Sequence, residues 1–131
     1  MVDKWFSVQA AGTPPGEAVA TVERLTRHPD FDWKNPNRLR ALIGAFAMGN
    51  PAGFHAADGG GYRLVVDWLV RLDPVNPQTT ARLAATFGNW RVFDSGRRAL
   101  MRGELERLAG LPGLSRDTGE IVGRLLREAE G

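Results

Sequence analysis

The stretch from Asn35 to Leu72, NPNRLRALIGAFAMGNPAGFHAADGGGYRLVVDWLVRL, decides the fold. Asn35-Pro36 predicts a helix start, because the asparagine side chain can accept a bond from a free N–H group and proline removes a donor that would otherwise lack a partner. Asn50-Pro51 and Asn76-Pro77 repeat this signal. After the first start, apolar residues recur at helical spacing and form one stripe: Leu39, Leu42, Ile43 and Phe46.

The end of the same stretch predicts the most apolar helix of the chain. The run Asp58-Gly59-Gly60-Gly61 interrupts the preceding helical pattern, and the segment from Tyr62 to Leu72 then has only three charged residues. These residues recur every four positions and therefore lie along one line of a helix: Arg63, Asp67 and Arg71. We expect a central helix that is buried nearly all round, with one charged seam.

The flanking segments also show helical periods, separated by corners rich in proline and glycine. Short helices are expected from Glu17 to about His28, from Gln78 to Phe87, from Ser95 to Leu108, and after a cap at Ser115. No segment alternates apolar and polar residues as a half-buried strand does, so the fold class is all-α. Six or seven short helices with tight corners predict a superhelical stack of short antiparallel helix pairs, a HEAT/armadillo-like solenoid.

Length and composition limit the possible classes of protein. With 131 residues, of which 43% are hydrophobic, the chain fits a single helical domain spanning residues 1–131. It has no apolar run near the roughly 20 residues that a membrane-spanning helix needs, and no export signal at its start. The net charge is +2 and its arginines are scattered among acidic residues, so we expect neither a nucleic acid nor a membrane as partner. The absence of cysteine fits a cytoplasmic location.

The sequence offers little for catalysis. His28 and His55 are the only histidines, and neither has a second ligand three or four positions away. Because a catalytic zinc ion needs about three protein ligands, we expect no metal site and no catalytic residue in this chain. We interpret His28 as a helix-end residue and His55 as a capping or core-bonded one. The glycines after Asp58 follow a helical turn and precede no lysine, so they predict a hinge and not a phosphate loop.

Trp5 and Phe6 stand near the start of the chain, where two exposed large aromatic side chains would be unusual. We interpret residues 3–10 as the tail of a helix that begins further upstream in a longer protein. The two aromatic side chains would then form an exposed patch that could drive self-association.

Polar side chains on two of the expected helices are candidates for contact with a ligand. Arg38 and Arg40 are two residues apart and point in different directions on a helix, whereas Gln78 and Arg82 are one turn apart and share a face. From the residues alone, each arginine is most simply a solvated side chain.

Three quoted segments carry a resemblance to a known family. NPNRLRALIGAFAMGNPAGFHAADGGGY, with DKWFSVQA upstream and NPQTTARLA downstream, resembles the C-terminal part of bacterial aminopeptidase N, a zinc metallo-aminopeptidase of the gluzincin class. The resemblance covers nearly the whole chain, but the family's catalytic domain and its H-E-x-x-H helix lie outside it. It implies a helical superhelix that arches over the active site of a longer enzyme. Zinc would belong to that parent enzyme, and the isolated chain would hold no cofactor and be inactive.

The resemblance also implies roles for Arg40, Gln78 and Arg82, which match positions facing the chamber between this domain and the zinc site. There they would help to limit and position peptide substrates, from which the parent enzyme removes N-terminal residues. The domain would pack against the catalytic domain of its own chain. The residues leave two alternatives: a stand-alone helical protein-interaction module, and an arginine-rich nucleic-acid binder that the scatter of arginines disfavours.

Overall fold

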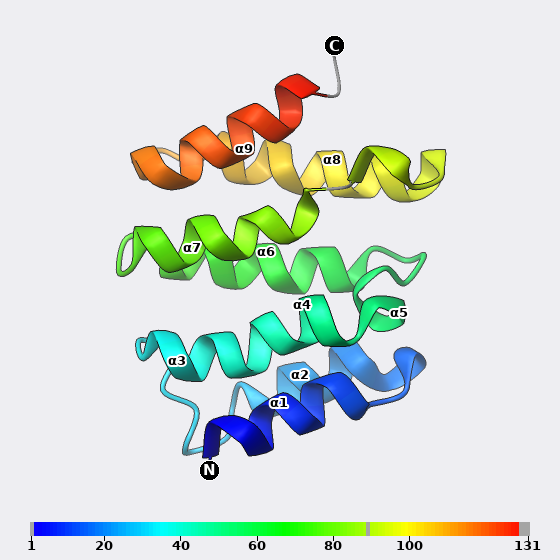
Figure 1. Ribbon diagram of the computed structural model, residues 1–131, viewed down its shortest axis with the longest axis vertical. Helices are drawn as coiled ribbons and strands as arrows, with labels where there is room; N and C mark the ends of the chain where they lie inside the picture. The colour runs from blue at the N-terminus through cyan, green and yellow to red at the C-terminus, as the bar shows by residue number, and fades with distance from the viewer. Residues whose placement is uncertain (1, 89, 129–131) are drawn as a thin grey trace. The chain divides into compact units, whose positions relative to one another are not determined.

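The computed structural model describes residues 2–88 and 90–128, and every regular element in this part of the chain is helical (Figure 1). The all-α prediction is therefore confirmed. None of the helices in these two ranges has the length and apolar character needed to cross a membrane. Contacts between residues divide the chain into two compact units, Met1–Val65 and Val66–Gly131. That residues 1–131 act as a single domain stays a prediction.

The first unit is built around α1, which packs against α2 and against a longer helical rod. The rod is continuous from Pro36 to Gly49 but changes its winding in the middle, where α3 passes through the π-helical turn η2 into α4. The elements of this unit are α1 (Val2–Gly12), η1 (Pro15–Glu17), α2 (Ala18–Leu25), α3 (Pro36–Leu39), η2 (Arg40–Gly44), α4 (Ala45–Gly49) and α5 (Pro51–Phe54).

The second unit is built around α9, which packs against both α7 and α8. Helix α6 (Gly60–Leu72) passes from the first unit into the second, and its residues from Val66 onward belong here. The other elements are α7 (Pro77–Ala84), η3 (Ala85–Phe87), η4 (Trp90–Val92), α8 (Ser95–Ala109) and α9 (Arg116–Glu128). The helices expected in this half of the sequence are therefore all present.

Each Asn-Pro dipeptide begins a helix, as predicted. The side-chain oxygen of Asn35 accepts two backbone N–H bonds at the start of α3, at 3.0 and 3.4 Å. Those of Asn50 and Asn76 each accept one such bond at 3.1 Å, at the starts of α5 and α7. Ser115 caps α9 in the same way, with its Oγ 3.2 Å from the backbone nitrogen of Thr118.

The burial of α6 follows the predicted pattern. The exposed positions of its charged seam are Arg63, Asp67 and Arg71. The buried positions include Tyr62, Leu64, Val65, Val66, Trp68, Leu69 and Leu72. A helix with this distribution is held in place mainly by apolar packing, since hydrophobic burial is the dominant favourable term in folding.

The expectation that Phe6 is exposed is wrong. Phe6 is fully buried because Phe31, from the connector after α2, packs edge-on against it with ring centroids 5.7 Å apart. The guanidinium carbon of Arg38 lies 5.9 Å from the same ring centroid. Trp5 stays 42% exposed beside the ring of His28. Phe31 thereby pins the connector to the core.

The glycine run before α6 provides a tight corner. Gly59 has a φ of +78°, a conformation that residues with a side chain rarely adopt. Gly61 lies so close to the backbone carbonyls of Phe54 and Gly53 that an added Cβ would clash with both. Asp58 steadies the corner by accepting a backbone N–H bond at 2.9 Å. The predicted break between two helices is therefore present, whereas the hinge interpretation stays a prediction.

Candidate functional site

Gln78 and Arg82 lie on α7, whose start is fixed by the Asn76 cap and by Pro77 at the first helical position. They are one helical turn apart, so they project from the same face, and both side chains are exposed. The other side of α7 is anchored by buried residues, namely Thr79, Thr80, Leu83 and Ala84. Packing of these buried residues therefore fixes the orientation of α7 and of its exposed Gln78–Arg82 face.

The Gln78 and Arg82 side chains make no hydrogen bond or ion pair to any residue in the ranges 2–88 and 90–128. An arginine that joined two helices through an acidic residue would show such a pair. Arg82 is thus a cation whose five N–H donors remain available to water or to a ligand.

Arg107 shows what a structural arginine looks like in the same unit. Its Nη2 lies 2.8 Å from Asp67 of the α6 seam and 2.6 Å from Glu104. Burial by itself would lower the pKa of Arg107, but hydrogen bonds to Glu104 and Asp67 outweigh it and raise this pKa above its ordinary value. Arg107 therefore stays charged and links α8 to α6, in contrast to Arg82.

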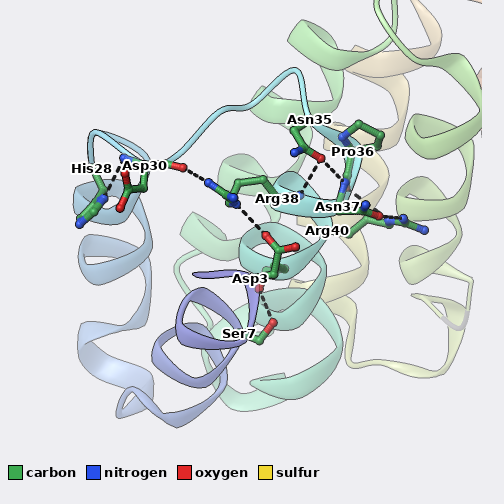
Figure 2. A network of polar contacts seen from close by, with 10 residues as sticks. Asp3, Ser7, His28, Asp30, Asn35, Pro36, Asn37, Arg38 and Arg40 are labelled. Carbon is green, nitrogen blue, oxygen red and sulfur yellow. Dashed lines mark hydrogen bonds and ion pairs between the residues drawn. The ribbon is translucent and has the colours of Figure 1, made fainter. Parts of the chain in front are cut away.

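Arg40 is the first residue of η2, and its side chain is exposed. Its Nε donates to the backbone carbonyl of Pro36 at 3.3 Å, and its Nη2 donates to Oδ1 of Asn37 at 2.5 Å (Figure 2). Both bonds hold the guanidinium against the first turn of its own helix. Arg40 thus has a defined direction, with further N–H donors left for solvent or a ligand.

Arg38, two residues earlier, points elsewhere and is used within the fold. Its Nε donates to Asp3 at 2.6 Å, and its Nη1 donates to the backbone carbonyl of Asp30 (Figure 2). Arg38 therefore connects α1, the connector and α3. The prediction that Arg38 and Arg40 do different jobs is consistent with these contacts.

The structure brings two of the three predicted substrate residues together. Gln78 and Arg82 share one face of α7 in the second unit, whereas Arg40 belongs to the first unit. Their assignment to a substrate chamber stays a prediction, because that chamber would be formed with parts of a longer protein.

The two histidines take part in local contacts. Nδ1 of His28 accepts the backbone N–H of Asp30 at 3.0 Å just after α2, and Nδ1 of His55 lies 2.7 Å from the Tyr62 hydroxyl. These contacts confirm the helix-end and core-bonded interpretations. Within the described part of the chain, no three His, Cys, Asp or Glu side chains gather as metal ligands would.

Sequence reasoning missed a buried carboxylate at Asp73, directly after α6. Its oxygens accept bonds from the backbone nitrogen and hydroxyl of Ser115 at 2.7 and 2.6 Å, and from the hydroxyl of Thr118 at 2.6 Å. These donors satisfy a charge that would otherwise be costly to bury. The visible signal was an acidic residue at the end of the most apolar helix, but its partners lie 42 and 45 positions away.

Comparison with known proteins gives one family match over nearly the whole chain. The profile of a family described as "Domain of unknown function (DUF3458_C) ARM repeats" matches residues 1–127. ARM repeats are stacks of short helices, so this match confirms the solenoid class predicted from the sequence.

Similar curated proteins carry the name aminopeptidase N. Those of Caulobacter vibrioides and Escherichia coli are each 44% identical over 126 residues, and that of Haemophilus influenzae is 41% identical over 127 residues. Each alignment covers 96% or 97% of this chain but 14% of the relative. The chain thus spans a small part of these relatives, and the matches confirm the resemblance drawn from the sequence.

A solved structure also matches nearly the whole of this chain. The crystal structure of Legionella pneumophila aminopeptidase A in complex with aspartic acid has a TM-score of 0.89 to this chain at 38% sequence identity. The match covers 97% of this chain and 15% of the Legionella protein.

Proposed function

The chain belongs to the DUF3458_C ARM-repeat family, and from this premise we propose that it is the C-terminal helical domain of a zinc-dependent aminopeptidase N. The parent enzyme removes N-terminal residues from peptides. This domain covers its active-site chamber and helps to limit and position the peptide. The support for the enzyme class is 44% identity, over nearly the whole chain, to two proteins of that name.

The exposed pair on α7 is the observation that carries the positioning role. The planar guanidinium of Arg82 suits a peptide's C-terminal carboxylate or its backbone carbonyls, because its N–H donors form a fixed fork. Gln78, one turn away, offers both a donor and an acceptor. Since neither has a partner among the described residues, both can meet a peptide without first breaking a bond. Arg40 would act in the same way, in the direction that Pro36 and Asn37 give it.

Zinc does not fit the residues of this chain that the structure describes. The imidazole Nδ1 atoms of His28 and His55 are already in hydrogen bonds, and no group of three possible ligand side chains gathers in residues 2–88 or 90–128. In the proposed enzyme the metal is therefore held by another part of the polypeptide. This domain contributes binding and exclusion of poorly fitting substrates, and no catalytic group.

The outer face of α1 supports the proposal that the domain packs against other parts of its own polypeptide. Trp5 and Val8 lie about one turn apart on α1, and they are 42% and 57% exposed. Exposed apolar side chains that lie together on one helix fit contact with another segment, and the relatives are proteins of which this chain spans 14%.

The positioning role is tested by Arg82→Ala in the full-length enzyme. Charge-assisted hydrogen bonds are worth roughly 1.5–3 kcal/mol when desolvated and less in a wet cavity, so we expect peptide kcat/KM to fall by up to about tenfold. The loss should lie mostly in KM, because contacts remote from the reacting bond stabilise ground and transition states alike. A single-residue chromogenic amide does not reach α7, and its kinetics should stay unchanged. Gln78→Ala should show the same pattern with a smaller effect.

Arg98→Ala is the matched control, since Arg98 is another exposed arginine, on α8. It should leave the kinetics of both substrates unchanged. Equal losses on amide and peptide for Arg82→Ala, together with a lowered melting temperature, would instead assign Arg82 to structure and reject the positioning role.

A further inference from the structure

The rod of the first unit changes its winding at η2. In an α-helix the backbone N–H of Ala45 would donate to the carbonyl of Ala41, four residues earlier. Here it donates to the carbonyls of Arg40 and Leu42. The carbonyl of Ala41 therefore does not accept the bond from Ala45 that an α-helix would give it.

Ser7 of α1 bonds to this carbonyl from another helix. Its hydroxyl donates to the carbonyl of Ala41 at 2.9 Å, across 34 positions of sequence (Figure 2). A serine within a helix commonly bonds to a carbonyl of its own preceding turn. This one reaches a neighbouring helix at the point where the helical ladder is interrupted, so a tertiary contact stabilises the π-helical turn.

Both ends of the rod are fixed independently of Ser7. The Asn35 cap and the Arg38–Asp3 pair hold α3, and the burial of Phe46 holds α4. The extra residue of the π turn rotates α3 by about 100° relative to α4, the angle of one residue in a helix of 3.6 residues per turn. The backbone N–H of Ala45 donates to a carbonyl five residues earlier, which is that of Arg40 itself.

We propose that Ser7 is a positioning residue for Arg40, and through Arg40 for the peptide substrate. By holding the carbonyl next to Arg40, Ser7 keeps the π turn in place and steadies the backbone from which the Arg40 side chain leaves the rod, while the bonds to Pro36 and Asn37 orient its guanidinium. This inference rests on the proposed function, because it gives Arg40 a substrate to meet.

The structural half of the proposal is tested by amide hydrogen exchange on the 131-residue chain. Ser7→Ala should make the Ala45 N–H exchange faster, because the π turn loses its tertiary donor. Thr13→Ala is the matched control and should leave exchange at Ala45 unchanged: its hydroxyl also donates to a half-buried backbone carbonyl, but to that of Gln9, four positions earlier. Equal exchange at Ala45 in Ser7→Ala and the parent chain would overturn the proposal.

The functional half is tested by kinetics of the full-length enzyme on a long peptide and on a single-residue amide. We expect Ser7→Ala to raise the peptide KM by about threefold, less than Arg40→Ala, and to leave the amide KM unchanged. Since KM does not depend on the amount of active enzyme, partial misfolding does not imitate this result. Ser7→Cys, which keeps a weak donor, should restore part of the loss.

Arg40→Ala separates the two possible failures. If Arg40→Ala leaves the peptide KM unchanged, the proposed substrate contact of Arg40 is wrong. If Arg40→Ala raises the peptide KM and Ser7→Ala does not, the contact stands and the positioning role of Ser7 is wrong.

Discussion

Asn50 and Asn76 give the same signal in the sequence, an asparagine before a proline at a helix start, but they make different contacts. Asn76 caps α7 through one backbone N–H. Asn50 is 5% exposed and caps α5 in the same way, and its Nδ2 also donates to the backbone carbonyls of Ala10 and Thr13 at 3.0 and 2.8 Å. One asparagine serves its own helix, and the other also holds the end of α1.

The difference shows that a capping signal predicts where a helix begins, but not how much the capping residue contributes to the free energy of unfolding. Side chains at a helix start can satisfy local N–H groups from any position, exposed or buried. Only a buried start, such as that of Asn50, can also satisfy carbonyls of another element. Replacing one asparagine at a time measures the two contributions separately.

The largest effect is expected for Asn50→Ala. The substitution removes the cap of α5 and leaves the carbonyls of Ala10 and Thr13 without their donor, which should cost roughly 2–4 kcal/mol of unfolding free energy. Urea denaturation of the 131-residue chain measures it. Asn50→Ser keeps a capping oxygen but not the amide donor, so it should remain clearly destabilising. A near-neutral Asn50→Ser would show that the bonds to Ala10 and Thr13 contribute nothing.

A smaller effect is expected at the purely local caps. Asn76→Ala and Asn35→Ala should each cost about 0.5–2 kcal/mol, the usual range for removing an N-cap. Asn76→Ser should be close to neutral, because serine caps nearly as well as asparagine. If Asn76→Ser destabilised the chain as much as Asn50→Ser, the distinction between the two corners would fail. Unchanged melting of both alanine variants would reject the capping assignment.

The smallest effect concerns a charged and exposed cap, Asp94 at the start of α8. A side-chain hydrogen bond from Arg97 lowers the pKa of Asp94 below its ordinary value of 3.8. A lowered folded-state pKa means that the bond stabilises the fold above about pH 4 and that this stability is lost as the pH falls through the lowered pKa. Asp94→Asn keeps a capping oxygen without the charge. Its urea midpoint should therefore lie slightly below that of the parent chain at neutral pH and converge with it in acid. A constant difference between the two midpoints across the acid range would contradict this.

Local rules predicted much of the fold. The Asn-Pro starts, the Ser115 cap, the buried face of α6 and the glycine corner depend on residues within a few positions of one another. The π turn η2 was not predicted, and the Ser7 hydroxyl that bonds to it lies 34 positions away. The burial of Phe6 was missed because the connector that covers it comes later in the chain.

For the candidate site too, features set by nearby residues were predictable and features set by distant residues were not. The shared face of Gln78 and Arg82 follows from helical spacing and is present on α7. Which arginines lack a partner among residues 2–88 and 90–128 was not predictable, because the acidic partners of Arg38 and Arg107 come from other elements. Which exposed residues would face a substrate does not follow from helical spacing, because it depends on the elements that lie opposite them.

We propose that the Gln78–Arg82 face of α7 meets the peptide. Photo-crosslinking tests this contact most directly. A photo-crosslinking phenylalanine analogue at position 78 of the full-length enzyme, irradiated with a bound peptide of several residues, should yield an enzyme–peptide adduct. Excess unlabelled peptide should suppress it, and irradiation with a single-residue amide in place of the peptide should yield no adduct. The same analogue at Glu120, an exposed position on α9, is the matched control and should yield no adduct. We expect a peptide-dependent adduct at position 78 alone. No adduct there, or equal adducts at positions 78 and 120, would show that this face of α7 does not meet the peptide.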